Sequence, residues 1–182
     1  MESALLKFMT RRQAFCKRAL DVVCVESLGG GAVNTCFGNA HDQLRQQGVS
    51  IVSGWLAEPL EPMQNSQAQR QFTQHWWNFD ERSREYFDTS PEIEKGTIYI
   101  LDYDIALFAI NNNERLSSCV SRSVVYWSGG FYTVECGSNG YDLQPAPDLS
   151  TERLFASFLL PTPQCEVEEP ASQFNLGAVL NH

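Results

Sequence analysis

Two aromatic runs with alternating polar positions predict a β-hairpin near the middle of the chain, with strands at residues 72–79 and 85–88. Charged and polar residues at 80–84 separate the runs, as in the longer class of hairpin loop. The first strand carries His75 and the second ends at Asp88. Because residues on paired strands lie beside each other on one face of a sheet, we expect these two side chains to be neighbours.

Apolar residues recur at three- and four-residue steps from residue 3 to about residue 25, which predicts an amphipathic helix with Ser3 as its N-cap. The basic residues of this segment fall mostly on the opposite face: Lys7, Arg11, Arg12, Lys17 and Arg18. That face is either the solvated side of an ordinary core-facing helix, which is the commoner case, or a surface for a membrane or a partner.

A second helix is expected to begin at Cys36, capped by Asn34 or Thr35, and to end at Gly48. Three glycines at 29–31 precede it and allow a close approach to neighbouring backbone. The first turn of a helix offers free N–H groups and the positive end of the dipole, which stabilise a thiolate and a developing oxyanion. Cys36 is therefore the candidate nucleophile.

The rest of the chain is rich in β-strand signals. Apolar runs bounded by turn residues predict strands at residues 49–60, 96–101, 105–110, 123–127 and 130–135, the last two forming a second hairpin. Residues 61–71 are polar and glutamine-rich, which predicts a surface loop or a short helix, and residues 150–160 predict a short helix. Asp102 and Asp104 are interpreted as loop charges.

Size and composition agree with one globular domain. The chain has 182 residues, of which 43% are hydrophobic and 19% charged, which suits a folded core rather than a disordered chain. We therefore predict a single α+β domain over residues 1–160, in which N-terminal helices pack on an antiparallel β-sheet. Residues 161–182 are expected to form a Pro- and Glu-rich tail.

Charge and cysteine usage restrict the partners and the compartment. The formal net charge of −9 disfavours nucleic acid as a partner. The sequence contains no run of about 18 apolar residues, so no membrane span is predicted. Basic residues interrupt the N-terminal segment, which would be apolar in a signal peptide. The six cysteines lack zinc-site spacing, and no acidic cluster indicates calcium. We expect a cytoplasmic protein with free thiols and no metal or cofactor, with delivery elsewhere as an effector left open.

Four motifs follow one another in a recognisable order: Cys36 at the start of a helix, Gly54-Trp55 on the next strand, His75-Trp76-Trp77, and Asp88-Thr89-Ser90-Pro91. This order resembles the transglutaminase-like branch of the papain-like cysteine enzymes, over about residues 30–91. The resemblance implies a papain-like/transglutaminase-like core and a Cys36–His75–Asp88 triad. Arylamine N-acetyltransferases have similar spacing, but their Arg-Gly-Gly-x-Cys lead is absent here.

Such a triad implies thiol-dependent acyl transfer on amide carbonyls, through a thioester that water or an amine resolves. In this hypothesis His75 takes the proton of Cys36 and Asp88 orients the imidazole. The expected activities are amide hydrolysis as in thiol proteases, glutamine deamidation and transamidation, on a protein or peptide. The alternative is a non-catalytic protein-binding module on the same scaffold.

Three further residues are predicted to shape the site. The Asn34 side chain is the candidate oxyanion donor beside the Cys36 N–H. Trp55 and Trp77 are candidates for the walls of the substrate cleft, where they would exclude water. Because adjacent strand residues face opposite ways, at least one of Trp76 and Trp77 is expected to fill the core instead.

Overall fold

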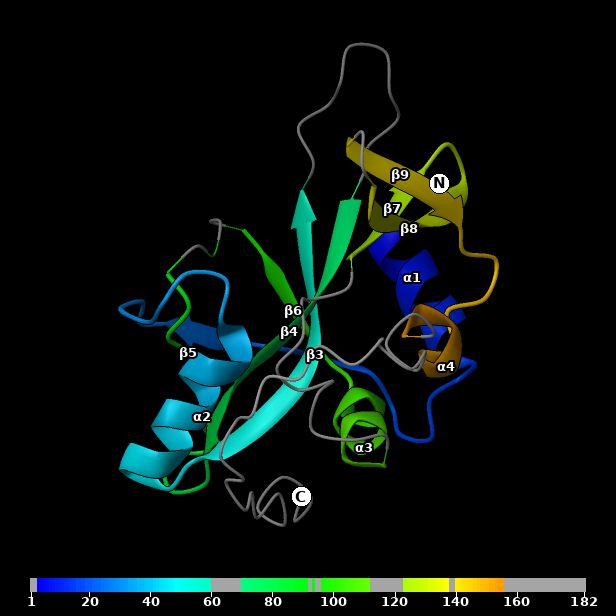
Figure 1. Ribbon diagram of the computed structural model, residues 1–182. Helices are drawn as coiled ribbons and strands as arrows, with labels where there is room; N and C mark the ends of the chain where they lie inside the picture. The colour runs from blue at the N-terminus through cyan, green and yellow to red at the C-terminus, as the bar shows by residue number, and fades with distance from the viewer. Residues whose placement is uncertain are drawn as a thin grey trace.

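Helices and one large sheet make up the part of the chain that the computed structural model describes, which is residues 3–59, 70–91, 93, 96–111, 123–137 and 140–155. The fold is α+β, as predicted (Figure 1). In chain order the elements are α1 (Ala4–Gln13), β1 (Asp21–Val23), β2 (Val25–Ser27), α2 (Cys36–Gln47), β3 (Ser50–Pro59), β4 (Arg70–Asp80), β5 (Glu85–Asp88), β6 (Ile98–Leu101), α3 (Tyr103–Asn111), β7 (Ser123–Trp127), β8 (Gly130–Gly137), β9 (Gly140–Pro145) and α4 (Thr151–Leu154).

Some predictions fall on residues outside these ranges. The expected tail at 161–182 and most of the expected loop at 61–71 lie there, so they stay predictions. Within the described ranges, no helix is both long enough and apolar enough to cross a membrane.

The two longest strands, β3 and β4, form the centre of the sheet and pair antiparallel along the whole of β3. The main path of the sheet is β1-β6-β3-β4-β7-β8-β9, while β5 pairs with β4 and, in parallel, with β2. Both predicted hairpins are confirmed, as β4–β5 and β7–β8. In the second, Ser128 and Gly129 both have positive φ, as a two-residue type I′ turn requires.

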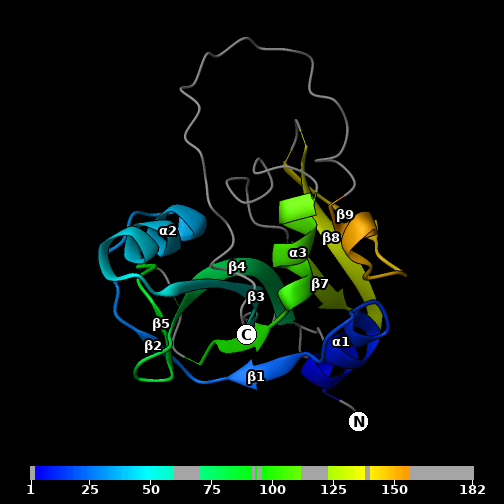
Figure 2. The same ribbon diagram turned by 90° about the horizontal axis from the view of Figure 1, so that it is seen from below.

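One edge of β4 changes partner along its length. On the side away from β3, β7 pairs with residues 70–73 and β5 pairs with residues 78–80. Within the described ranges, no strand pairs with residues 74–77 on that side. Helix α2 approaches there, and its Phe37 meets Trp76 of β4 edge-on at a ring-centroid distance of 5.3 Å. Figure 2 shows α2 beside the curved β3–β4 pair. The interruption therefore gives a helix end lateral access to the middle of β4.

Gly54 lets β3 fit between β4 and β6. Its register partners are His75 on β4 and Leu101 on β6. A Cβ atom at this position would collide with the carbonyl oxygen of Ile100 and press on the ring of Trp77. A side chain here would force β6 away from β3, so the close approach of the two strands requires glycine.

The two faces of the β3–β4 pair carry separate cores. On one face, the fully buried Phe8 of α1 stacks on Phe72 at a centroid distance of 3.9 Å and meets Trp55 edge-on at 5.4 Å. Residues of α2 and α3 belong to this larger core as well. The smaller core, on the other face, contains Val52, Leu56, Trp77, Tyr99 and Leu101.

The first predicted helix is confirmed only over its first half. As predicted, Ser3 caps α1, and its hydroxyl accepts the Leu6 N–H at 3.3 Å. The extension of this helix to residue 25 is wrong, because residues 21–23 and 25–27 form β1 and β2. The β-branched valines of this segment favour strands, and pairing with β6 and β5 satisfies their backbone.

The apolar run at residues 105–110 lies in α3 rather than in the predicted strand. Asp102 explains the outcome, because its Oδ1 accepts the Asp104 N–H at 3.1 Å and so caps the first turn. A short apolar run suits a buried helix as well as a buried strand. The cap, which hydrophobic periodicity does not register, favours the helix here.

Asp102 is a buried charge and not the predicted loop charge. Its carboxylate is 1% exposed, and Oδ2 accepts both Arg12 Nε and Trp55 Nε1 at 2.8 Å. Arg12 is fully buried as well, so the prediction that it lies on a solvated basic face is wrong. Its remaining nitrogens donate to the Leu149 carbonyl at 2.8 Å and to the Thr151 hydroxyl at 2.6 Å. The ion pair therefore links α1, β3 and the start of α4.

Replacing Arg12 should destabilise the fold strongly. Arg12→Ala leaves the Asp102 carboxylate buried without its cation, which typically costs about 3–5 kcal/mol. Urea unfolding followed by circular dichroism measures the loss. The matched control is Arg11→Ala, which removes the neighbouring, exposed arginine and its contact with the Phe131 ring, worth about 0.5–1 kcal/mol. Equal losses of unfolding free energy in the two variants would show that the buried ion pair stabilises the fold no more than the exposed arginine does.

Candidate active site

Cys36 is the first residue of α2, as predicted, and the loop before it is held tightly. The side chain of Asn39, one turn further along α2, accepts the Ala32 N–H at 2.9 Å and donates to the Ala32 carbonyl at 2.8 Å. The Thr35 hydroxyl donates to the same carbonyl at 3.1 Å. Asn34 has a φ of 57°, a left-handed conformation that asparagine tolerates better than most residues. These contacts fix the start of the helix and hence the thiol.

Gly31 joins this loop to the segment that follows β5. Its N–H donates to the Thr89 carbonyl at 2.8 Å. A Cβ atom at Gly31 would lie 2.6 Å from the Asn39 side chain and from the Thr89 oxygen. The expected close approach of the glycine segment is therefore confirmed at Gly31, and it brings the cysteine loop next to Asp88.

His75 and Asp88 form a buried contact, as the hairpin predicted. His75 Nε2 lies 2.6 Å from Asp88 Oδ2, and both side chains are nearly inaccessible to solvent. Oδ2 also accepts the Tyr99 hydroxyl at 2.9 Å, while Oδ1 accepts the Ser90 N–H at 2.8 Å. The Ser90 hydroxyl lies 3.5 Å from His75 Nε2. Protein donors thus hold the carboxylate in place, and the carboxylate orients the imidazole through Nε2.

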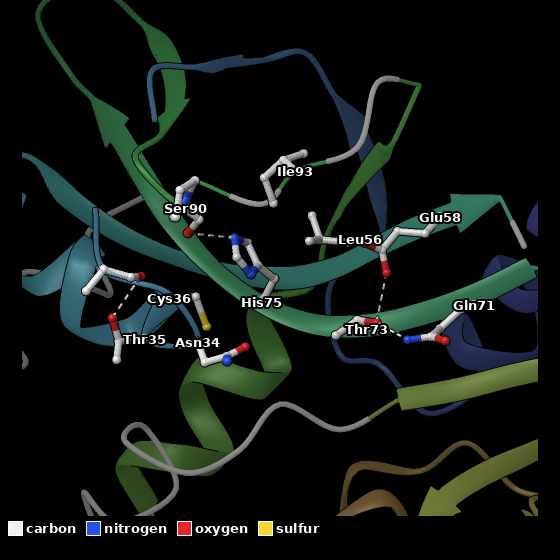
Figure 3. A pocket seen from close by; sticks show the side chains of 12 residues that line it. Asn34, Thr35, Cys36, Leu56, Glu58, Gln71, Thr73, His75, Ser90 and Ile93 are labelled. Atoms are coloured by element: carbon white, nitrogen blue, oxygen red, sulfur yellow. Dashed lines mark hydrogen bonds between the residues drawn. The ribbon is translucent and has the colours of Figure 1, made fainter. Parts of the chain in front are cut away.

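The thiol approaches the other side of the imidazole. His75 lies in the interval of β4 that neither β5 nor β7 covers, and the N-terminus of α2 reaches it there. Figure 3 shows the Cys36 sulfur below the ring, toward the nitrogen that does not contact Ser90. A hydrogen bond between the Cys36 and His75 side chains helps to raise the pKa of the imidazole. The structure therefore brings Cys36, His75 and Asp88 together in that order.

The contacts of His75 favour its protonated form. Burial by itself lowers the pKa of the imidazole, because desolvation disfavours the charged ring. Hydrogen bonds and charge interactions with Asp88 and Cys36 outweigh burial and raise the His75 pKa from 6.5 to about 9. Burial also raises the pKa of Asp88, but its contacts with His75 and Ser90 bring that pKa below its ordinary value. At neutral pH the pair is an imidazolium and a carboxylate.

The site opens into a pocket of about 580 Å³. Its lining joins the loop before α2, the strands β3 and β4, and the segment after β5: Ala32, Asn34, Thr35, Cys36, Leu56, Glu58, Gln71, Thr73, His75, Ser90, Pro91 and Ile93. The predicted oxyanion residue, Asn34, is therefore at the pocket beside Cys36 (Figure 3).

The two tryptophans predicted as cleft walls do not line this pocket. Trp55 and Trp77 are each 0% exposed, and they belong to the cores on opposite faces of the β3–β4 pair. The prediction that they wall the cleft is therefore corrected: large apolar rings fill the cores. Leu56, Pro91 and Ile93 supply the apolar lining instead.

Sequence reasoning missed three residues of the site. Ser90 belongs to the Asp88-Thr89-Ser90-Pro91 motif, and a serine two residues after an aspartate is a common hydrogen-bond partner in turns. Tyr99 and Glu58 come from strands with no local motif. They reach the site only through the register in which β6 and β4 pair with β3.

Comparisons with protein-family models, curated proteins and solved structures gave no match. Among the residues that the structure describes, no group of three or more His, Cys, Asp and Glu side chains is arranged to hold a metal ion. What the site can do is therefore inferred from its own geometry.

The raised pKa of His75 makes stability depend on pH. A group whose pKa rises on folding adds stability that is fully present below the unfolded pKa, near 6.5, and lost as pH rises through the folded value, about 9. The difference in unfolding free energy between wild type and His75→Gln should therefore shrink over this window, by on the order of 3 kcal/mol. Urea titrations across the pH range test this. His41→Gln is the control, because it leaves the His75–Asp88 contact intact; a constant wild-type-minus-His75→Gln difference would contradict the assignment.

Tyr99→Phe should raise the pKa of His75 further. The substitution removes one donor from Asp88 Oδ2, so that oxygen interacts more strongly with the imidazolium. It should also cost about 1–2 kcal/mol of stability, because a buried carboxylate loses a hydrogen bond. An NMR titration of the His75 ring protons measures the pKa. Tyr132→Phe, on β8, is the control, and an unchanged His75 pKa in Tyr99→Phe would refute the coupling.

Proposed function

We propose that this protein is a thiol-dependent acyl-transfer enzyme that acts on amide carbonyls of proteins or peptides, with Cys36, His75 and Asp88 as a catalytic triad. One observation carries the proposal: a buried histidine lies between a helix-borne thiol and a carboxylate 2.6 Å from its Nε2, at the wall of a pocket. The same proposal includes the finer fold assignment, a transglutaminase-like core. The order of helix, strand, His-bearing strand and Asp-bearing strand supports it.

The first half of the reaction forms a thioester. With its pKa raised to about 9, His75 is protonated at neutral pH, which supports a thiolate–imidazolium pair with Cys36. The thiolate attacks the carbonyl carbon, and the carbonyl electrons move to oxygen. As the tetrahedral intermediate collapses, the C–N bond breaks and His75 gives its proton to the leaving nitrogen. Asp88 keeps the imidazolium oriented throughout.

The second half resolves the thioester. Water or an amine attacks the carbonyl carbon, His75 accepts its proton directly or through a bridging water, and the C–S bond breaks to restore the thiolate. Water gives hydrolysis of an amide or deamidation of a glutamine, whereas an amine gives transamidation. The two outcomes share every residue of the triad.

The oxyanion is expected to form at the start of α2. The Cys36 N–H and the positive end of the helix dipole favour negative charge at this position. The Asn34 side chain is proposed as the second donor, since Asn34 lines the pocket beside Cys36. The loop before α2 is held by hydrogen bonds, which supports this role, because a fixed donor needs little reorganisation during the reaction.

The proposed compartment is the reducing cytoplasm, because the mechanism needs a free thiol. Among the described residues, Cys16, Cys24 and Cys36 form no disulfide bond. The proposed partner is a protein or peptide substrate, for which the pocket has a suitable size.

Iodoacetamide labelling at about pH 6, mapped by mass spectrometry, tests the pair directly. Cys36 should label faster than the other thiols, and His75→Ala should slow it by roughly tenfold or more, because the thiolate loses its counter-ion. Two cysteines of the same chain serve as internal controls. Cys24 is exposed, and burial together with Asp102 raises the pKa of Cys16 to about 12. Their labelling should not depend on His75.

Turnover separates an enzyme from a binding module on the same scaffold. Ammonia release from glutamine-containing peptides should require Cys36 and disappear in Cys36→Ala. If Cys36 labels no faster than Cys24, or labels equally in His75→Ala, the triad is not functional and the protein is better explained as a non-catalytic binding module.

A further inference from the structure

The pocket runs away from the triad along two paired strands. In the β3–β4 register, Gly54 is opposite His75, Leu56 is opposite Thr73, and Glu58 is opposite Gln71. Alternate residues of a strand share a face, so the side chains of these β3 and β4 positions project to the same side as His75. Figure 3 shows Leu56, then Thr73, and then Glu58 with Gln71 at increasing separation from the imidazole. The triad thus lies at one end of the pocket and Glu58 at the other.

A chain of hydrogen bonds ends on the Glu58 carboxylate. Gln71 Nε2 donates to Thr73 Oγ1 at 3.0 Å and to Ser123 Oγ at 3.3 Å. The Thr73 hydroxyl in turn donates to Glu58 Oε2 at 3.1 Å. Because this chain runs toward the carboxylate, it holds Glu58 in a defined orientation at the pocket wall.

Glu58 also gives its end of the pocket a charge. Among the described residues that line the pocket, Glu58 is the only one outside the triad with a formal charge at neutral pH. Leu56 and Ile93 are the apolar lining residues on the way to it. A carboxylate at the end of a partly apolar groove suits a long side chain with a cationic tip, such as arginine or lysine.

We propose that Glu58 determines specificity by binding the guanidinium or ammonium group of a basic residue in the substrate peptide. The inference rests on the proposed function, because the triad defines where the reacting carbonyl lies. Gln71 is four positions before His75 on β4, which corresponds to roughly 13 Å. An extended peptide advances about 3.4 Å per residue. The basic residue is therefore three or four positions from the reacting carbonyl.

The same distance distinguishes this group from an attacking amine. A nucleophile that resolves the thioester must come within about 3.5 Å of the acyl carbon. A cation held at Glu58 lies too far away to be that nucleophile. Glu58 is thus assigned to recognition of the acyl-donor peptide, whichever acceptor resolves the thioester.

Affinity labels of matched shape test the proposal. Chloroacetyl peptides with one, two or three glycines followed by arginine amide alkylate a thiolate with loss of chloride. The matched neutral labels carry citrulline in place of arginine. At low ionic strength, wild-type Cys36 should react about fivefold to tenfold faster with the best arginine label than with its citrulline partner. The preference should weaken as salt is raised, because exposed charges are screened.

Glu58→Gln should abolish the preference for arginine, so that the arginine and citrulline labels react at equal rates. The matched control is Glu85→Gln, which removes an equal charge from an exposed position on β5 and should keep the preference. Equal rates for the two labels in the wild type, or a preference that survives Glu58→Gln, would overturn the proposal. Loss of the preference in both variants would also overturn it, since the overall negative charge would then be responsible.

The design separates this inference from the proposed function. If the triad is inactive, Cys36 labelling becomes independent of His75 with both labels, yet the arginine preference still reports on Glu58. If Cys36 does not label at all, binding of acetyl-glycyl-glycyl-arginine amide to the wild-type chain is followed by NMR. Amide shifts at Glu58 and Thr73 that are absent with the citrulline peptide support the proposal, and equal shifts with both peptides refute it.

Discussion

Burial of the Asp102 carboxylate is the constraint on which the rest of the structure depends. A charge taken out of water must be compensated by ion pairing and hydrogen bonds. Arg12 of α1, Trp55 of β3 and the first turn of α3 provide this compensation. These elements are therefore fixed relative to one another on one face of β3. The opposite face of the same strand carries Leu56 and Glu58 into the pocket.

The two buried aspartates have different partners, and the partners define their roles. Asp102 faces a guanidinium, a rigid planar group that donates hydrogen bonds and accepts none. Asp88 faces an imidazole, the side chain best suited to exchanging a proton near neutral pH. The first pair holds the architecture, whereas the second leaves one group able to gain and lose a proton in the pocket.

Local patterns in the sequence predicted the parts of the site that local structure determines. The alternation at residues 72–88 placed His75 beside Asp88, and cap and stop signals placed Cys36 at a helix start. The segment at residues 105–110 was predicted wrongly because it is apolar on every side, a pattern that suits a strand and a helix equally. Its helix depends on a cap at Asp102. Tyr99 and Glu58 reach the pocket through strand register between segments distant in sequence, which no local pattern encodes.

The glycine at position 54 affects which positions of this chain would be sensitive to substitution. It carries no chemistry, yet the absence of a side chain there lets β6 lie close to β3, and the Tyr99 hydroxyl of β6 reaches Asp88. A random-mutagenesis screen for loss of the proposed activity would therefore recover changes at Gly54 together with changes at the proposed triad. In a survey of tolerated substitutions, this backbone position would look like a member of the candidate active site.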